Sequence, residues 1–216
     1  MKKLNVFYIF TTALVFAACG GGNQANNSAD TGLATPLTTA ETSGLQYMRE
    51  EEELAQNLYM DIFNNKGLSV FQTISQKSET QHAAQMLVLL NTYTVADPST
   101  GSANTYTNPE LQTLYNTLLA AATGATSTNL SALMTGALVE EVDISDINIR
   151  KAQVLPAHQI IIATYDNLLC GSRNHLRAFV AQIELLTGQP YVIQVPALAA
   201  EVNAILNGTQ EQCGMI

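Results

Sequence analysis

Six carboxylate and imidazole side chains occur in this 216-residue chain at spacings that could bring them together. They are Glu52, Glu79, His82, Glu140, Asp143 and His175. Oxygen and nitrogen donors of this kind, without a thiolate, suit iron, manganese or zinc and disfavour copper(I). The sequence could therefore build a metal centre, provided that the segments carrying these residues fold against one another.

Glu52 lies on the apolar face of a helix that the sequence predicts over residues 45–62. Core-type residues recur there at alternating three- and four-residue steps, which places them on one face. That face consists of Leu45, Met48, Glu52, Ala55, Tyr59 and Ile62. We interpret the neighbouring Glu50, Glu51 and Glu53 as a solvated first turn favoured by the helix dipole. Only Glu52 is expected to point inward.

Glu79 and His82 belong to a second predicted helix, which begins after Gly67 and ends near Tyr93. The two residues are one turn apart on the same face, so both can bind one ion. A Glu-x-x-His pair arises by chance in many helices and is weak evidence alone. Its weight comes from the coincidence with Glu52 in the preceding helix.

The third predicted helix covers residues 129–149 and offers Glu140, Glu141 and Asp143. Its apolar stripe contains Leu133, Ala137, Glu140, Ile144 and Ile147. The pattern leaves open whether Glu140 or Glu141 points inward. We favour Glu140, because it shares a face with Asp143 three residues on and both could serve one site.

His175 lies on the inner face of a fourth predicted helix, which begins near Pro156 and ends near Thr187. The face consists of Ile161, Tyr165, Leu168, Ser172, His175, Phe179 and Ile183. A single histidine on an apolar face is usually a hydrogen-bonded core residue. We interpret His175 as a ligand because the other helices carry polar residues at a matching depth. His158 has no such company and is expected at the surface.

Burial of four carboxylates in one bundle requires a compensating positive charge. An unpaired buried carboxylate is costly, and several together raise one another's pKa until some take up protons. Two divalent ions would balance the four charges, with both histidines as neutral nitrogen donors. We therefore expect two divalent metal ions, with iron favoured and manganese or zinc as alternatives.

The N-terminus predicts export. Lys2 and Lys3 precede an apolar stretch over residues 6–18, which is followed by Cys19 and three glycines, as in a bacterial lipoprotein signal. We expect residues 1–18 to be the signal peptide and Cys19 to carry lipid that anchors the protein to a membrane of the bacterial cell envelope. An ordinary secretory signal is the alternative. Residues 19–43 are poor in bulky apolar side chains and are expected to form a flexible tether.

The remaining cysteines and the overall charge bear on domain organisation and partners. Cys170 and Cys213 form an even pair in an exported protein, which favours a disulfide over a redox-active role. The formal net charge of −9 argues against nucleic acid as a partner. We expect one domain over residues 44–190 and a C-terminal extension over residues 191–216 that forms a strap and a short helix. Whether the chain forms a homodimer stays open.

The chain also resembles a known family. Glu52 with Tyr59, together with the run Glu79-Thr80-Gln81-His82, looks like the first half of the ferritin and rubrerythrin pattern. Residues 136–144 and 171–179 are similar to a bacterial family of ferritin-like domains of unassigned function. The resemblance implies an all-α fold, a ferritin-like four-helix bundle.

Two features of the sequence relate to this resemblance. A loop over residues 96–107 and a short helix, capped by Asn108 and ending near Ala122, suit the long crossover between the second and third helices of such bundles. Ser172 stands where the wider superfamily has glutamate. Either the second metal is held less tightly, or Asp143 replaces the missing carboxylate.

The function that the resemblance implies is redox chemistry at a carboxylate-bridged pair of metal ions. The reaction would be oxidation of ferrous iron, or reduction of a small-molecule oxidant such as dioxygen or peroxide. Glu79 and one acid of the third helix would bridge the ions, and Tyr59, Glu141 and Ser172 would lie beside the ligands. The alternative is a non-catalytic surface lipoprotein that binds metal or a protein partner.

Overall fold

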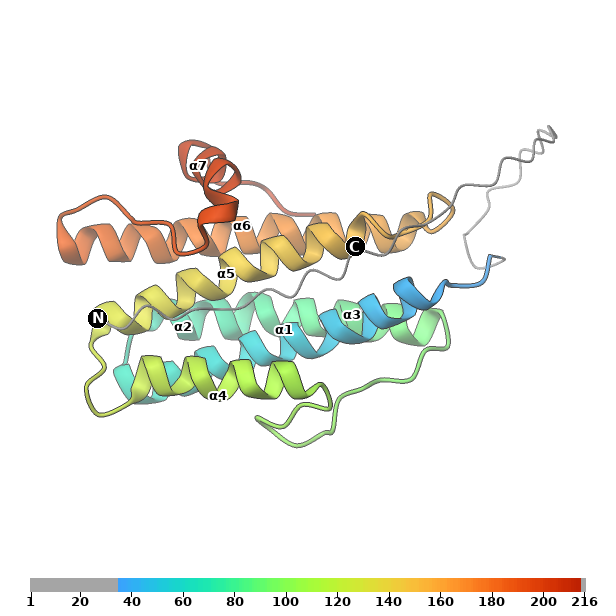
Figure 1. Cartoon of the computed structure of the whole chain (residues 1–216), viewed down its shortest axis with the longest axis horizontal. Coiled ribbons are helices and arrows are strands. Elements are labelled where there is room, and N and C mark those ends of the chain that lie inside the picture. Colours follow the sequence, from blue (N-terminus) through green and yellow to red (C-terminus); the bar gives the residue numbers. More distant parts are fainter. Residues whose placement is uncertain (1–34, 215–216) are drawn as a thin grey trace.

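A computed structural model describes residues 35–214 of the chain. Within this range all regular secondary structure is helical (Figure 1). The elements are α1 (Thr39–Lys66), α2 (Ser69–Ile74), the π-helical turn η1 (Ser75–Glu79), α3 (Thr80–Thr92), α4 (Pro109–Thr123), α5 (Asn129–Lys151), α6 (Gln159–Thr187), the 3-10 turn η2 (Pro196–Leu198) and α7 (Ala199–Asn207). The expected signal peptide, Cys19 and most of the expected tether lie outside the described residues.

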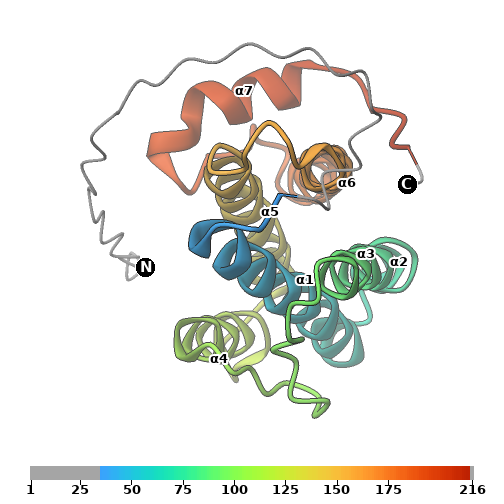
Figure 2. The same ribbon diagram turned by 90° about the vertical axis from the view of Figure 1, so that its right-hand side faces the viewer.

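Four helical rods form the bundle that carries the site. They are α1, the continuous rod α2–η1–α3, α5 and α6. Viewed end-on, α4 packs outside these rods against α1 and α5, and α7 lies on the opposite side against α6 (Figure 2). The predicted all-α bundle is confirmed. The fourth rod begins at Gln159, three residues later than the expected Pro156. No helix in residues 35–214 is both long and apolar enough to cross a membrane.

Three buried aromatic rings fix the rods next to the site. Tyr59 of α1 lies 5.5 Å from Phe71 of α2 and 5.3 Å from Phe179 of α6, measured between ring centroids, and the two phenylalanine rings are 4.9 Å apart. Gly136 of α5 permits this packing, because a Cβ there would come within 2.6 Å of the Phe179 ring. Tilted aromatic contacts of this kind add to the free energy of burial. All four rods therefore meet at this cluster.

The sequence predicts a single regular helix for the second rod, but the rod contains a π-helical turn at Ser75–Glu79. The backbone N–H of Thr80 reaches the carbonyl of Ser75, five residues back, and the Thr80 hydroxyl donates to the same carbonyl at 2.9 Å. The buried Ser75 hydroxyl in turn donates to the carbonyl of Gln56 in α1 at 2.9 Å. Side-chain hydroxyls thus hold the wider turn, and such π turns occur often at functional sites.

A buried ion pair closes the N-terminal end of the bundle. α1 begins at Thr39, so residues 39–43, which we expected in the tether, are helical. Glu41 completes a capping box with Thr38, and its other oxygen accepts hydrogen bonds from the Leu155 amide at 2.8 Å and from His158 Nδ1 at 2.5 Å. The prediction of a surface position for His158 is wrong, because the residue is buried. Its burial is possible because the Glu41 carboxylate, from the first turn of α1, pairs with its imidazole.

The interpretation of Glu50 and Glu51 as solvated residues is also wrong, since both are buried. Glu50 accepts hydrogen bonds from the backbone amides of Thr107 and Asn108, the second at 3.0 Å, and so fixes the start of α4. Burial, with the nearby charge of Asp146, raises the pKa of Glu51 well above its usual range. The crossover and α5 cover a helix face that periodicity alone assigns to solvent.

Candidate metal centre

The structure brings five of the six expected ligands together in two buried triads. The triads are Glu52, Glu79 and His82, and Glu79, Glu140 and His175. Within each triad the donor atoms all lie within 4.8 Å of one another. Glu79 belongs to both. One ion in each triad would therefore share the Glu79 carboxylate.

Both histidines turn the same ring nitrogen toward the acids. Nδ1 of His82 lies 3.2 Å from Glu52 and 3.0 Å from Oε2 of Glu79. Nδ1 of His175 lies 2.8 Å from Oε1 of Glu79 and 3.5 Å from Glu140. The two imidazole rings are near neighbours, with centroids 5.6 Å apart. Glu79 thus faces each histidine with a different oxygen, which is the arrangement that a bridging carboxylate requires.

Glu140, rather than Glu141, faces the triads. The Tyr59 hydroxyl donates to Glu140 Oε1 at 2.5 Å and so orients the carboxylate. Glu141 points away and accepts hydrogen bonds from the Tyr191 hydroxyl at 2.8 Å and from the Val195 amide at 2.7 Å. Its carboxylate anchors the C-terminal strap to α5. The choice that the sequence left open is settled by these separate sets of partners.

Asp143 is buried but belongs to neither triad. The Ser172 hydroxyl donates to Asp143 Oδ2 at 2.5 Å. Burial, together with the charges of Glu52 and Glu140, raises the pKa of Asp143 well above its usual range. The serine that replaces the expected glutamate therefore holds an acid of the neighbouring helix, and Asp143 lies beside the two triads rather than within them.

The pKa of Glu79, which contacts both histidines, is shifted in the opposite direction from the pKa values of the other acids of the site. Burial raises the pKa of Glu52 to about 7, although the nearby His82 opposes the rise. Burial acts in the same direction on Glu79, but the charges of His175 and His82 outweigh it and lower its pKa. Burial lowers the pKa of His175, whereas Glu79 and Glu140 more than reverse this and raise it to about 10. Without metal, protons on the imidazoles supply the positive charge.

Two carboxylate oxygens indicate that a cation fits the site better than these protons alone. Among the described residues, Glu52 Oε1 and Asp143 Oδ1 are buried and lack a hydrogen-bond partner. Buried polar atoms are rarely left without a partner. Three carboxylates and two imidazole nitrogens form a donor set that suits divalent iron, manganese or zinc. The residues present therefore fit a pair of divalent metal ions.

Gly171 is a residue of the site that the sequence analysis missed. A Cβ at this position would lie 2.5 Å from Cε1 and Nε2 of His82, closer than real Cβ contacts allow. The glycine therefore lets α6 approach the imidazole ring. The signal was present in the sequence, because glycine within a long helix is unfavourable unless close packing requires it.

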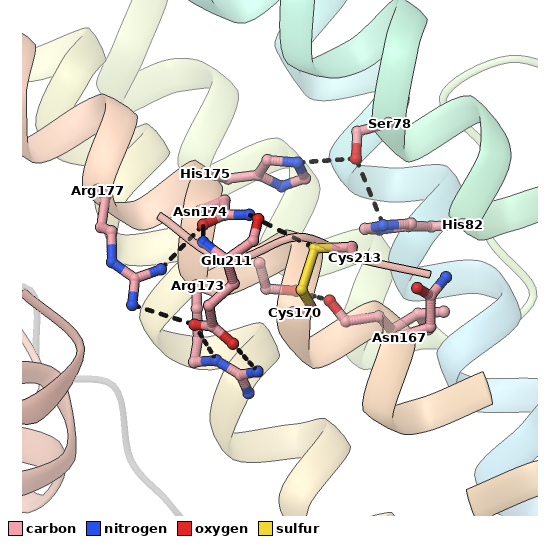
Figure 3. Close-up of a disulfide and its surroundings, with 12 residues drawn as sticks. Ser78, His82, Asn167, Cys170, Arg173, Asn174, His175, Arg177, Glu211 and Cys213 are labelled. Atoms are coloured by element: carbon pink, nitrogen blue, oxygen red, sulfur yellow. Dashed lines mark hydrogen bonds and ion pairs between the residues drawn. A yellow bond between two sulfur atoms is a disulfide. The ribbon is translucent and has the colours of Figure 1, made fainter. Parts of the chain in front are cut away.

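A disulfide joins the C-terminal tail to α6 near the triads. Cys170 pairs with Cys213, and Cys170 directly precedes Gly171 (Figure 3). Glu211 of the tail accepts hydrogen bonds from Arg173 Nε at 2.7 Å and from Arg177 Nη2 at 3.0 Å. The tail is thus fixed along the stretch of α6 that carries His175.

Comparison with known proteins places the chain in a family. Residues 41–209 match the family described as "Uncharacterized protein domain (DUF2202)". The chain is 34% identical over 151 residues to "Uncharacterized protein MJ0754" of Methanocaldococcus jannaschii. The aligned region covers 68% of this chain and 77% of the relative. The chain is also similar to the crystal structure of hypothetical protein MJ0754 from Methanococcus jannaschii DSM 2661, with a TM-score of 0.73, 31% identity, and coverage of 82% of this chain and 97% of that chain. This chain therefore belongs to the DUF2202 family.

Proposed function

We propose that this protein is a di-metal oxidoreductase that acts on ferrous iron, dioxygen or peroxide. The observation that carries the proposal is the position of Glu79, whose two carboxylate oxygens face the histidines of two separate buried triads. Iron is the favoured metal, because carboxylate-rich sites with imidazole bind it and it can change oxidation state. The all-helical bundle and the sequence resemblance to ferritin-like proteins support the same chemistry.

Each group of the site has a role in this proposal. Glu52 and His82 would hold one ion, Glu140 and His175 would hold the other, and Glu79 would bridge them. When bound, the ions would supply the electrons for the reduction of an oxidant. Tyr59 keeps the Glu140 carboxylate oriented through its hydroxyl. Asp143, held by Ser172, is a carboxylate near both triads that could carry a proton, because its pKa is raised.

We also propose that the reaction takes place in the bacterial cell envelope. The N-terminal sequence with Lys2, Lys3 and Cys19 supports a lipid-anchored protein. The disulfide between Cys170 and Cys213 supports an oxidising compartment, because such bonds are rare in the cytosol. Both features are independent of the metal centre.

A non-catalytic metal-binding protein is the second candidate. The observation that favours it is the position of Asp143 outside both triads, with serine in place of a glutamate ligand at residue 172. A site with fewer carboxylate ligands could bind a metal ion without catalysing a reaction. The two candidates share the metal site and differ only in whether the bound metal reacts.

Metal content tests the site that both candidates share. We expect the full chain, loaded with Fe²⁺ without oxygen, to retain two ions per molecule after gel filtration. The variant Glu79→Ala/His82→Ala should lose both, because it removes the shared carboxylate. Glu110→Ala, at an exposed position in α4, is the control and should retain them. If wild type and both variants bind equally little iron, the proposed metal centre does not exist.

A single-turnover experiment then separates the two candidates. Oxygen or hydrogen peroxide is added to the ferrous protein, and the absorbance of ferric iron is followed in a stopped-flow instrument. We expect a rise within one turnover in the wild type and in Glu110→Ala. A protein that binds two ions but shows no absorbance change beyond that of free iron would favour the non-catalytic candidate.

A further inference from the structure

A single hydroxyl faces both histidines on the side away from the acids. Ser78 Oγ lies 2.8 Å from Nε2 of His175 and 3.4 Å from Nε2 of His82 (Figure 3). We propose that Ser78 is a positioning residue that holds the proton of both imidazoles on Nε2 and so presents both Nδ1 atoms to metal. The inference rests on the proposed metal centre and adds a residue to it that links its two halves.

The chemistry of the hydroxyl permits this double role. A neutral imidazole that binds metal through Nδ1 must carry its proton on Nε2 and donate it in a hydrogen bond. A serine oxygen has two lone pairs and can accept from both rings at once. The contact with His175 is the shorter of the two, so the loss of Ser78 should affect the His175 triad more.

Local structure explains how Ser78 reaches both rings. Ser78 precedes His82 by four residues, which places the two on one helix face. It belongs to η1, the turn held by Ser75 and Thr80, and this turn faces α6 at His175. The two rings lie close enough, with centroids 5.6 Å apart, for one oxygen to serve both.

Three variants separate positioning of the imidazoles from support of the helix. Ser78→Ala removes the acceptor, and Ser78→Thr retains it. Gln76→Ala is the matched control, because this glutamine lies in the same turn but is exposed to solvent. We expect Ser78→Ala to weaken Zn²⁺ binding about 10- to 100-fold, as loss of partners of metal ligands usually does. Ser78→Thr and Gln76→Ala should bind as the wild type does.

The readouts are chelator competition for Zn²⁺ and NMR of the histidine rings in the zinc-loaded full chain. In the wild type we expect the Nε2–H protons of His82 and His175 to exchange slowly with water. Ser78→Ala should speed this exchange at both rings, and Ser78→Thr should restore it. The inference is overturned if Ser78→Ala matches the wild type in both measurements, or if Gln76→Ala weakens binding equally. Failure of the wild type to bind zinc would overturn the proposed metal centre as well. A wild type that binds zinc as tightly as Ser78→Ala does would overturn only the role of Ser78.

Discussion

The Tyr59 hydroxyl donates a 2.5 Å hydrogen bond to Oε1 of Glu140, whose other carboxylate oxygen lies 3.5 Å from Nδ1 of His175. Tyr59 is fully buried among aromatic rings, so Tyr59→Phe keeps the packing and removes only the donor. We expect a loss of about 1–3 kcal/mol of stability in the metal-free protein, because a buried acceptor loses its partner. Urea denaturation measures this loss, and chelator competition should show weaker binding of one of the two ions.

Tyr106→Phe is the control for the Tyr59 variant. Tyr106 is also buried, but its hydroxyl accepts from Asn57 and does not contact the triads. The Tyr106→Phe variant should lose some stability and retain both metal ions. Equal metal affinity in Tyr59→Phe and Tyr106→Phe would contradict the role that we assign to Tyr59.

Gly171→Ala should displace His82, since the new Cβ would lie 2.5 Å from the ring. Alanine is favoured over glycine within a helix by up to about 1 kcal/mol, so helix propensity alone would make this variant more stable. We expect it to remain folded and to lose the ion of the Glu52 triad. Inductively coupled plasma mass spectrometry of the loaded protein measures the number of bound metal ions. Retention of both ions would show that the ring does not need this close approach.

Metal binding should release protons and weaken as the pH falls. The pKa of His175 is raised to about 10 in the metal-free chain, since Glu79 and Glu140 outweigh burial. An ion that binds Nδ1 must displace this proton. Calorimetry in buffers of different ionisation enthalpy should therefore show proton release at pH 8, and the apparent affinity should rise with pH. Uptake of metal without proton release would contradict Nδ1 ligation.

The same raised pKa predicts how the stability of the metal-free protein depends on pH. The folded value of about 10 exceeds the ordinary value of 6.5, so the ion pair of His175 stabilises the fold fully below pH 6.5. This stabilisation is lost as the pH rises through about 10. Denaturation of the metal-free wild type between pH 6 and 10 should show the decline, and His175→Gln should not.

Glu41 predicts the opposite pH dependence at the end of the bundle. Burial would raise its pKa, but hydrogen bonds from His158, Thr38 and Leu155 lower it from 4.5 to about 2. Its contribution to stability is present above pH 4.5 and is lost as the pH falls toward 2. Glu41→Gln should cost roughly 2–3 kcal/mol at pH 7 and much less at pH 2.5. Thermal denaturation at both pH values, with exposed Glu110→Gln as control, tests this.

The disulfide is expected to stabilise the fold without taking part in the chemistry. It joins residues 43 positions apart, and its removal in Cys170→Ser/Cys213→Ser should cost about 4 kcal/mol. The tail keeps its contacts from Glu211 to Arg173, so the triads should survive at low temperature. A variant that stays folded and binds both ions but no longer reacts with oxygen would assign the cysteines a redox role instead.

Helical periodicity was sufficient to predict the helix faces that carry the triads. It predicted the inward positions of Glu52, Glu79 and His175, because a period of 3.6 residues determines which side chains share a helix face. It failed for Glu50 and His158, since their partners, the amides before α4 and the Glu41 carboxylate, come from distant parts of the sequence. Periodicity describes one helix at a time and does not reveal what packs against its other faces.

The details of the site depend on features that residue types do not encode locally. The π turn at residues 75–79 leaves no clear mark in the sequence, although it positions Ser78. The role of Ser172 also required coordinates, because the sequence shows only that a glutamate is missing. In the structure its hydroxyl holds Asp143 at 2.5 Å. Ligand types and the position of Tyr59 beside them were therefore predictable, whereas the contacts of Ser78 and Ser172 were not.

Anomalous X-ray diffraction from crystals of the full chain loaded with Fe²⁺ or Mn²⁺ tests the central claim most directly. We predict two anomalous peaks between α1, α3, α5 and α6, one on each side of the Glu79 carboxylate, with the Nδ1 atoms of His82 and His175 as ligands. The absence of any peak in this region, or metal bound only elsewhere on the molecule, would contradict the account.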